Sequence, residues 1–343
     1  MRKLLNTLYI TSPDAYLALD GENVVVQKNK EVIGRIPLHN LEAIMAFGYT
    51  GASPALLGKC ARMNISLSFL SSSGQFQAKV TGKSYGNILL RREQYRLSDK
   101  EEKSVPIARN FIIGKIYNQK SVIQRAIRDY PMRIDIEQLK RVSDQLQAIL
   151  KSVYESDNID SIRGYEGEAA AIYFSVFDSL ILQQKDTFVF DGRNRRPPID
   201  RVNAMLSFAY TLLTDMCTSA LETVGLDPYA GFMHTDRPGR VSLALDLVEE
   251  LRAPFADRFV LSVINKKMVS EGDFSVKENG AVLMDDECRK TFLNAWQSKK
   301  MDKITHPYLQ EKVEWGMVPY VQAMLLARYI RGDIEEYPVF FWK

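Results

Sequence analysis

The sequence predicts an α+β protein in which a small amino-terminal β-sandwich domain is followed by a larger all-α domain. Short apolar runs with strand character crowd the first 90 residues, and apolar residues recur at helical spacing after that point. The length of 343 residues also exceeds that of one typical domain. The predicted domains are therefore residues 1–90 and residues 91–343.

The first domain is predicted from short strands that are separated by turn signals. Asp20-Gly21 is typical of a tight hairpin turn, and Ser53-Pro54 is typical of a helix cap with proline at the first helical position. We therefore expect one helix after Ser53. The expected strands are Leu4–Ile10, Tyr16–Leu19, Val24–Gln27, Val32–Ile36 and Ile65–Leu70. Many short strands at close spacing predict a small sandwich with one helix in it.

The second domain is predicted to be helical because its apolar residues recur three and four positions apart. Pro131 separates the first two long segments. Asn279-Gly280 predicts an isolated hairpin between residues 274–276 and 281–283. The expected helices cover residues 112–130, 139–153, 169–182, 202–224, 242–251 and 320–330.

The helix expected over residues 242–251 carries acidic side chains at the edge of an apolar segment. Residues three or four apart on a helix have Cβ atoms about 5–6 Å apart, so Asp246 can converge with Glu249 or Glu250 on one ion. The opposite face is rich in leucine and is expected to pack against a core. The alternative is an ordinary solvated acidic face, which this segment alone does not exclude.

His234 and Glu166 are two further candidates for a functional site. His234 is one of three histidines and lies in a loop with several prolines and glycines, just before the acidic helix. A lone loop histidine is nevertheless more often structural than a ligand. Glu166 lies between Gly164 and Gly167, which permit close approach of a backbone or a phosphate. Its alternative role is to complement the dipole at a helix start, together with Glu168.

Together, the carboxylates of Glu166, Asp246 and Glu249 and the imidazole of His234 predict a dispersed site for a hard divalent cation. Such an oxygen-rich set suits Mg²⁺ or Mn²⁺, whereas zinc usually takes more nitrogen or sulfur. The three cysteines are widely separated and form no CxxC motif, so neither structural zinc nor a disulfide framework is expected.

Four motifs occur along the chain in a specific order and spacing. They are Arg-Gly-Tyr-Glu166-Gly, Asn194-Arg-Arg-Pro-Pro-Ile-Asp-Arg-Val-Asn203-Ala-Met-Leu-Ser-Phe-Ala-Tyr210, Gly231-Phe-Met-His234 and Ser-Leu-Ala-Leu-Asp246-Leu-Val-Glu249-Glu250. Jointly they resemble the CRISPR-associated integrase that inserts new spacers, the Cas protein numbered one. The resemblance covers essentially the whole chain, which is most similar to the type I-C branch of that family.

This resemblance implies that the all-α domain is catalytic and acts on DNA with Mg²⁺ or Mn²⁺. The implied metal ligands are Glu166, His234, Asp246 and Glu249. Many members have aspartate at the position of Glu249, so Glu250 stays an alternative to it as the last ligand. The implied reaction is direct transesterification by a 3′-hydroxyl end, without a covalent enzyme intermediate.

The resemblance also implies partners. They are double-stranded DNA as prespacer and CRISPR repeat, a second copy of the chain in a homodimer, and the small ferredoxin-like Cas protein numbered two. Because the β-rich domain mediates dimerisation in the family, the self-contact is expected within residues 4–36.

Contacts to DNA must come from local clusters of arginine, because a net charge of +3 is low for a DNA-binding protein. Arg237 and Arg240 flank the histidine loop and are placed to neutralise a phosphate. The alternative for each cluster is a solvated face. The candidate DNA-binding residues are Arg91, Arg92, Arg193, Arg195, Arg196, Arg237 and Arg240.

Several function classes are not indicated by this sequence. It has no apolar run of about 18 residues and no charged-then-apolar leader, so a cytoplasmic protein without a membrane segment is expected. It lacks the phosphate-binding and dinucleotide-binding glycine motifs, H-E-x-x-H and G-x-S-x-G. Two other functions stay open: a DNA-binding scaffold whose acidic residues are structural, and a metal-dependent nuclease that uses water.

Overall fold

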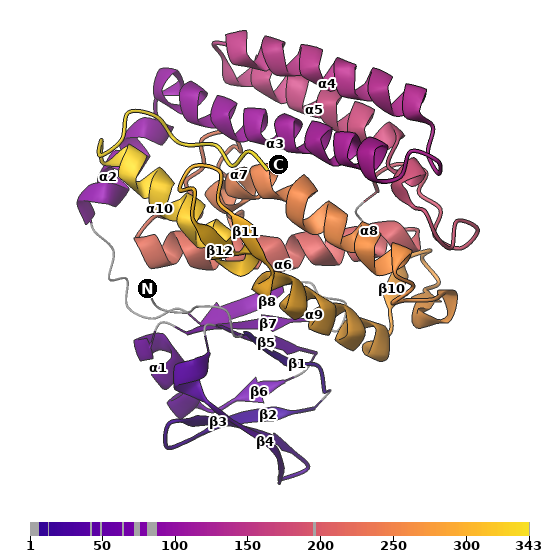
Figure 1. The fold of residues 1–343 in the computed structure, drawn as a ribbon. Coiled ribbons are helices and arrows are strands. Elements are labelled where there is room, and N and C mark those ends of the chain that lie inside the picture. The colour runs from indigo at the N-terminus through magenta and orange to yellow at the C-terminus, as the bar shows by residue number, and fades with distance from the viewer. Residues whose placement is uncertain are drawn as a thin grey trace. The chain divides into compact units, whose positions relative to one another are not determined.

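The computed structural model describes residues 7–12, 14–41, 43–48, 50–63, 65–71, 76–80, 88–194 and 197–342. Its contacts divide the chain into two compact units, Met1–Tyr85 with Met284–Asp302, and Gly86–Leu283 with Lys303–Lys343. Strands dominate the amino-terminal part and helices dominate the rest, which confirms the predicted α+β class (Figure 1). One helix from late in the chain, α9 (Asp286–Met301), groups with the first unit, although its residues lie within the predicted second domain, 91–343.

The first unit contains two four-stranded sheets, with strand orders β1-β5-β7-β8 and β4-β3-β2-β6. In the first sheet β1, β5 and β7 are parallel and β8 is antiparallel to β7. In the second, β2, β3 and β4 form an antiparallel meander, and β6 pairs with β2 in parallel. The strands are β1 (Thr7–Ile10), β2 (Tyr16–Asp20), β3 (Asn23–Lys28), β4 (Glu31–Pro37), β5 (Ala43–Phe47), β6 (Gly51–Ala52), β7 (Ser66–Leu70) and β8 (Phe76–Val80).

Both sheets and helix α1 (Pro54–Met63) contribute to one hydrophobic core, as the predicted sandwich requires. Ile44 and Leu67 come from the first sheet, Leu17 and Val24 from the second, and Leu56 from α1. The backbone N–H of Leu56 donates to the Ser53 hydroxyl at 3.3 Å, so the predicted helix cap is confirmed. The Asp20-Gly21 hairpin is confirmed as well, whereas residues 4–6 of the first predicted strand lie outside the described residues.

The second unit is built around the long helix α3, which packs against α4, α5 and α7. Its helices are α2 (Ile88–Ser98), α3 (Glu101–Asp129), α4 (Ile136–Glu155), α5 (Ile159–Ser175), α6 (Arg201–Val224), α7 (Ser242–Leu251), α8 (Arg258–Asn265) and α10 (Val318–Ile330). A π-helical turn, Arg252–Asp257, joins α7 to α8. Two short hairpins complete the set, β9 (Phe274–Val276) with β10 (Val282–Met284), and β11 (Lys303–Thr305) with β12 (Lys312–Glu314).

Polar caps set where helices α5 and α6 begin. Asn158 caps α5 by accepting from the N–H of Ser161, and Asp200 caps α6 by accepting from the N–H of Asn203. Helix α5 therefore begins about ten residues before the predicted start at residue 169, and Glu166 lies inside it rather than ahead of it. Gly225, at a φ of 88°, ends α6 in the left-handed conformation that glycine adopts readily.

The carboxy-terminal segment packs on its own unit, a question that the sequence left open. The N–H of Phe340 donates to Glu250 at 2.9 Å, and the N–H of Trp342 donates to the side-chain oxygen of Asn118 on α3 at 2.8 Å. The guanidinium of Arg258 lies over the Trp342 ring at 4.1 Å. The segment is therefore part of the packing around α3 and α7.

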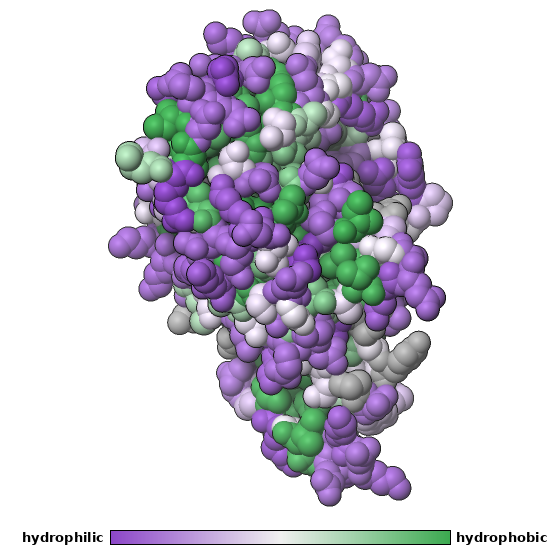
Figure 2. Space-filling view, turned by 90° about the vertical axis from the view of Figure 1, so that its right-hand side faces the viewer, coloured by the Kyte–Doolittle hydropathy of each residue, from purple (hydrophilic) through white to green (hydrophobic). Residues whose placement is uncertain are grey.

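Hydrophilic residues predominate on the molecular face in Figure 2, and its apolar patches are small and separated. Among the described residues, no helix combines the length and the apolar composition that crossing a bilayer requires.

We predict that His306 makes the stability of the protein depend on pH. In its buried ring, Nε2 lies 3.1 Å from the side-chain oxygen of Gln322, and Nδ1 accepts a hydrogen bond from the N–H of Leu309 at 3.3 Å. The neutral imidazole has one donor and one acceptor nitrogen, so it satisfies both contacts. Burial lowers the pKa of His306 below its usual value. Folding therefore favours the neutral ring, and its contribution is complete above about pH 6.5 and is lost as the pH falls through the folded-state pKa.

Urea denaturation of wild type and His306→Gln at about pH 7.5 and about pH 5 measures this contribution. The wild type should lose more free energy of unfolding than the variant does between the two conditions. Equal losses in the two proteins would contradict the prediction.

Candidate functional site

The histidine loop is fixed to α7 by one buried carboxylate. Asp246 is 0% exposed, and its Oδ2 accepts from the N–H groups of Phe232 at 2.7 Å and Met233 at 3.1 Å. Its Oδ1 accepts from the N–H of His234 at 3.0 Å and lies 2.6 Å from Nδ1 of the same residue. A carboxylate has about four lone-pair sites, so these contacts saturate Asp246. The imidazole consequently turns Nδ1 towards Asp246 and presents Nε2 on its other side.

Three further residues shape this loop. A Cβ on Gly231 would lie 2.8 Å from the Ser242 Cβ and 3.0 Å from Asp246 Oδ2, so only glycine permits the close approach to α7. Gln94 of α2 donates to the carbonyls of Asp227 at 2.8 Å and Ala230 at 2.9 Å. Arg163 of α5 donates to the carbonyl of Met233 through two nitrogens, at 3.1 and 2.6 Å. The histidine is therefore held by α2, α5 and α7 together.

Two carboxylates from different helices meet at a buried lysine. Lys115 of α3 is 3% exposed, and its Nζ donates to Glu166 of α5 and lies 2.8 Å from Oε2 of Glu249 on α7. The other oxygen of Glu249 lies 2.8 Å from Nη2 of Arg252. Glu166, Glu249 and the two cations thus form one cluster, in which the negative and positive charges balance; Glu249 and Lys115 are buried, whereas Glu166 is half-buried.

The charged form of Glu249 is strongly favoured. Burial by itself would raise the pKa of this carboxyl, but Arg252, Lys115 and His234 together lower it to about 2. Glu249 is therefore ionised at neutral pH. Asp246, which holds His234, lies three residues before Glu249 on α7, and Arg163, which binds the Met233 carbonyl, lies three residues before Glu166 on α5. The imidazole therefore lies near the Lys115 cluster.

Glu250, the alternative last ligand, has a different environment. It is fully buried and accepts from Gln322 Nε2 at 3.0 Å, from the N–H of Phe340 at 2.9 Å and from the Tyr337 hydroxyl. Burial raises its pKa to about 7, against the lowering effect of these hydrogen bonds. Gly114 makes room for it, because a Cβ there would lie 2.9 Å from the Glu250 Cβ. These contacts assign Glu250 to the interior packing with the carboxy-terminal segment.

As they stand, no three His, Cys, Asp or Glu side chains in the described part of the chain form a group that could hold a metal ion. The Lys115 ammonium between Glu166 and Glu249 gives a physical reason. The donors nevertheless suit Mg²⁺ or Mn²⁺, because Glu166 and Glu249 offer carboxylate oxygens, and the buried Glu249 Oε2 already contacts a cation, the Lys115 Nζ, at 2.8 Å. The contacts of Asp246 favour holding His234, which differs from the direct ligand role that the sequence suggested.

The candidate DNA-binding arginines have different environments. Arg237 and Arg92 are exposed, and Arg240 is half-buried at the end of the histidine loop. Arg91 donates to the carbonyl of Gly225 at 3.2 Å. Arg193 donates to Asn203 at 2.5 Å and lies 5.2 Å from the Tyr210 ring centroid, so it braces the loop before α6. Arg195 and Arg196 lie outside the described residues.

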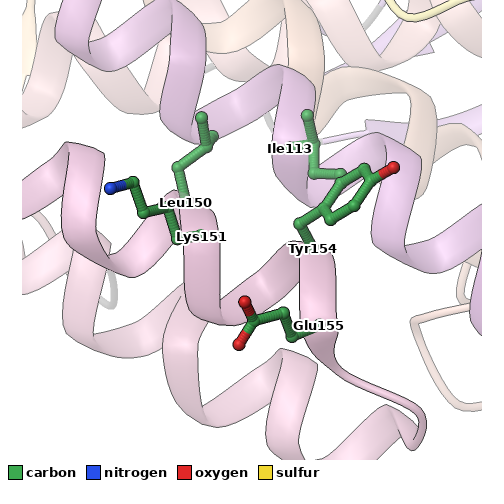
Figure 3. Close-up of a pocket in the computed structure, with 5 residues that line it drawn as sticks. All are labelled: Ile113, Leu150, Lys151, Tyr154 and Glu155. Atoms are coloured by element: carbon green, nitrogen blue, oxygen red, sulfur yellow. The ribbon is translucent and has the colours of Figure 1, made fainter.

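A surface hollow of about 300 Å³ lies between α3 and α4. Figure 3 shows Tyr154 of α4 beside Ile113 of α3, with Leu150, Lys151 and Glu155 completing the lining. None of the predicted site residues lines it.

Residues 8–298 match the family described as CRISPR associated protein Cas1. The chain belongs to the Cas1 family. It is 48% identical over 343 residues to CRISPR-associated endonuclease Cas1 1 of Chlorobaculum tepidum, with 100% of both chains covered. It is also 48% identical over 347 residues to CRISPR-associated endonuclease Cas1 2 of Rhodospirillum rubrum, again with 100% of both covered. The family predicted from the four motifs is confirmed.

Solved structures share the fold at low sequence identity. A Cas1 protein from Thermotoga maritima has a TM-score of 0.81 and 22% identity, and the match covers 98% of this chain and 100% of that one. A casposase bound to its integration product has a TM-score of 0.84 and 22% identity, with 97% and 93% covered. Cas1 structures therefore have the same arrangement of a strand-rich and a mainly helical part.

We predict that Asp246→Asn disorders the orientation of His234. The amide nitrogen of asparagine cannot accept a hydrogen bond, so contacts on one of the two carboxylate oxygens are lost, at about 1–3 kcal/mol for a buried donor left unpaired. Nitrogen NMR of the histidine rings should show the His234 tautomer, which Asp246 fixes in the wild type, becoming mixed.

The matched control is Asp227→Asn, because Asp227 lies in the same loop and accepts from the N–H of Tyr229 at 2.9 Å. It should leave the His234 signals unchanged. An unaltered His234 tautomer in Asp246→Asn would show that Asp246 does not position the ring.

Proposed function

We propose that the chain is a divalent-metal-dependent DNA integrase and endonuclease that inserts new spacers into a CRISPR array. The observation that carries this proposal is the meeting of Glu166 from α5 with Glu249 from α7, near a His234 held by Asp246. The relatives named CRISPR-associated endonuclease support the same class of reaction.

Each residue of the site has a distinct task in this proposal. Glu166, Glu249 and His234 through Nε2 hold the cation, and Asp246 orients the imidazole by its contact to Nδ1. Arg252 keeps Glu249 ionised and in place. When bound, Mg²⁺ or Mn²⁺ would polarise the target phosphodiester and stabilise charge on the leaving oxygen. The 3′-hydroxyl of a DNA end would form the new phosphodiester bond while the bond from phosphorus to the leaving oxygen of the target strand breaks, and the proton would pass to that oxygen or to water. No covalent bond to the protein would form.

The surface of α5 beside Glu166 supports a close approach of DNA. Gly164 and Gly167 flank Glu166 in the helix interior, and a Cβ on either would meet no other described atom within 4 Å. Glycine inside a helix costs about 1 kcal/mol relative to alanine, so two of them here need a reason. A nucleic-acid backbone lying against the bare helix gives one. Arg237 and Arg240, beside the histidine, would neutralise its phosphates.

The proposed partners are double-stranded DNA, a second copy of the chain and the small Cas2 protein. A structure described as a Cas6-RT-Cas1–Cas2 complex has a TM-score of 0.82 and 21% identity, and covers 99% of this chain and 36% of that one. A Cas1–DNA complex has a TM-score of 0.57 and 14% identity. For the self-contact, Val32 and Ile33 are exposed on β4, which ends the order of its sheet. Exposed apolar residues on an edge strand support pairing with another chain.

We predict that Glu166→Gln, His234→Ala and Glu249→Gln each reduce strand joining at least about a hundredfold, because each removes a donor to the cation. The assay contains the purified Cas2 partner, a repeat-bearing plasmid, a short duplex with 3′-hydroxyl ends, and Mg²⁺ or Mn²⁺. Joined products are separated on denaturing gels.

Glu168→Gln is the matched control, because Glu168 is an exposed carboxylate two residues from Glu166. It should retain activity. Full activity in the three site variants would indicate a scaffold whose acidic residues are structural. Cut fragments without any newly joined strand would indicate a nuclease that uses water.

We also predict that Gly167→Ala makes the helix more stable and the binding of DNA weaker. Alanine should raise the free energy of unfolding by up to about 1 kcal/mol, because it lowers the backbone entropy of the unfolded chain. Its methyl group should reduce DNA affinity several-fold in fluorescence anisotropy, because it occupies the surface on which DNA lies.

Gly58→Ala, inside helix α1 of the first unit, is the control that should change stability without changing DNA affinity. Unchanged DNA affinity in Gly167→Ala would contradict the proposed position of DNA along α5.

A further inference from the structure

Lys115 lies where the proposed function requires a metal ion. Its Nζ contacts one oxygen of Glu166 and lies 2.8 Å from one oxygen of Glu249, two of the proposed ligands. The side chain extends from α3, whereas Glu166 belongs to α5 and Glu249 to α7 (Figure 1). One ammonium thus joins the three helices that build the site.

A buried lysine needs a compensating partner. An ammonium that is 3% exposed is strongly unfavourable unless nearby negative charge compensates its lost hydration. Here two carboxylates provide that charge, and Lys115 reciprocally keeps them from repelling each other. Removing the lysine would leave Glu249 with its ion pair to Arg252 and would remove the contact of Glu166 with the Lys115 ammonium.

The ammonium and a divalent cation compete for the same carboxylate oxygens. In the metal-free cluster, Lys115 and Arg252 balance Glu166 and Glu249 in charge. A divalent cation added beside an unmoved Lys115 would bring excess positive charge into a buried region, where repulsion is stronger than in water. The lysine must therefore give up its contacts when the metal binds.

We infer that Lys115 is a positioning residue that acts as an internal cation, holding Glu166 and Glu249 together in the metal-free protein and being displaced by the metal. This inference rests on the proposed metal site. Lys115 therefore stabilises the metal-free protein and weakens the binding of the metal. Under this inference, loss of Lys115 strengthens the binding of the metal. If the lysine were purely structural, its loss would distort the ligands and would weaken the binding of the metal.

The experiment measures metal binding to the full-length protein without DNA. Mn²⁺ is titrated by calorimetry into wild type and Lys115→Met, and the melting temperature of each is followed over the same Mn²⁺ concentrations. Without metal, Lys115→Met should have a lower melting temperature than wild type. Addition of Mn²⁺ should raise its melting temperature by more than it raises that of wild type. Its Kd for Mn²⁺ should be lower by about tenfold, which corresponds to ~1.4 kcal/mol.

Two further variants keep the result interpretable. Lys115→Gln retains a polar amide that can donate to a carboxylate, so it replaces Lys115→Met if that variant does not fold, and it too should bind Mn²⁺ more tightly. Lys120→Met is the matched control, because Lys120 lies on the same helix and contacts Gln147 at 2.5 Å. It should bind Mn²⁺ like the wild type.

Glu249→Gln separates this inference from the proposed function. If it abolishes the Mn²⁺ binding seen in wild type, the proposed site stands, and unchanged or weaker binding by the Lys115 variants overturns the role of Lys115 alone. If Glu249→Gln binds Mn²⁺ like wild type, or if wild type binds none, both proposals are overturned.

Discussion

The four hydrogen bonds that Asp246 accepts from the histidine loop are the constraint on which the site depends. A buried carboxylate without such partners would be strongly unfavourable, so α7 and the loop at residues 232–234 require each other. Gly231 lets the loop lie close to α7 because it has no side chain, and Arg163 holds the loop in place by donating to the Met233 carbonyl. These contacts fix the orientation of the His234 ring in the ligand-free protein.

Neighbouring glutamates on α7 show how partners decide the role of a buried acid. Glu249 pairs with Arg252 and Lys115, and these cations together with His234 lower its pKa to about 2 despite burial. Glu250 faces only neutral donors from Gln322, Tyr337 and Phe340, and burial raises its pKa to about 7. The first is kept charged, as a ligand to a cation must be. The second lies in interior packing, so the sequence alternative of Glu250 as the last ligand finds no support in its contacts.

Periodicity and turn signals predicted most elements, because apolar spacing and caps act locally. The Ser53 cap, the Asn279-Gly280 hairpin and the helix after Ser242 are formed by neighbours in the chain. Helix α5 was expected too late, since the apolar run from residue 169 hid the start at the Asn158 cap. Lys115 could not be found, because its two partners belong to other helices and a lysine in the sequence resembles a solvated one. The sequence likewise does not predict that α9 belongs to the first unit, because this depends on contacts between residues far apart along the chain.

A site for a divalent cation must neutralise its own carboxylates whenever the cation is absent. At Glu249, Arg252 and Lys115 do so, because they help to lower the pKa that burial alone would raise, and the carboxylate stays charged at neutral pH. The two available cations differ in mobility. Arg252 lies mostly buried in a π-helical turn. Its Nη2 lies 2.8 Å from Glu249 and its guanidinium lies 4.8 Å from the Tyr210 ring centroid, and a planar group with two such contacts is hard to move. Lys115 has a flexible four-carbon stem and a point charge. If a metal binds as proposed, its exchange with a protein cation would therefore be easier at Lys115, while Arg252 would continue to hold Glu249.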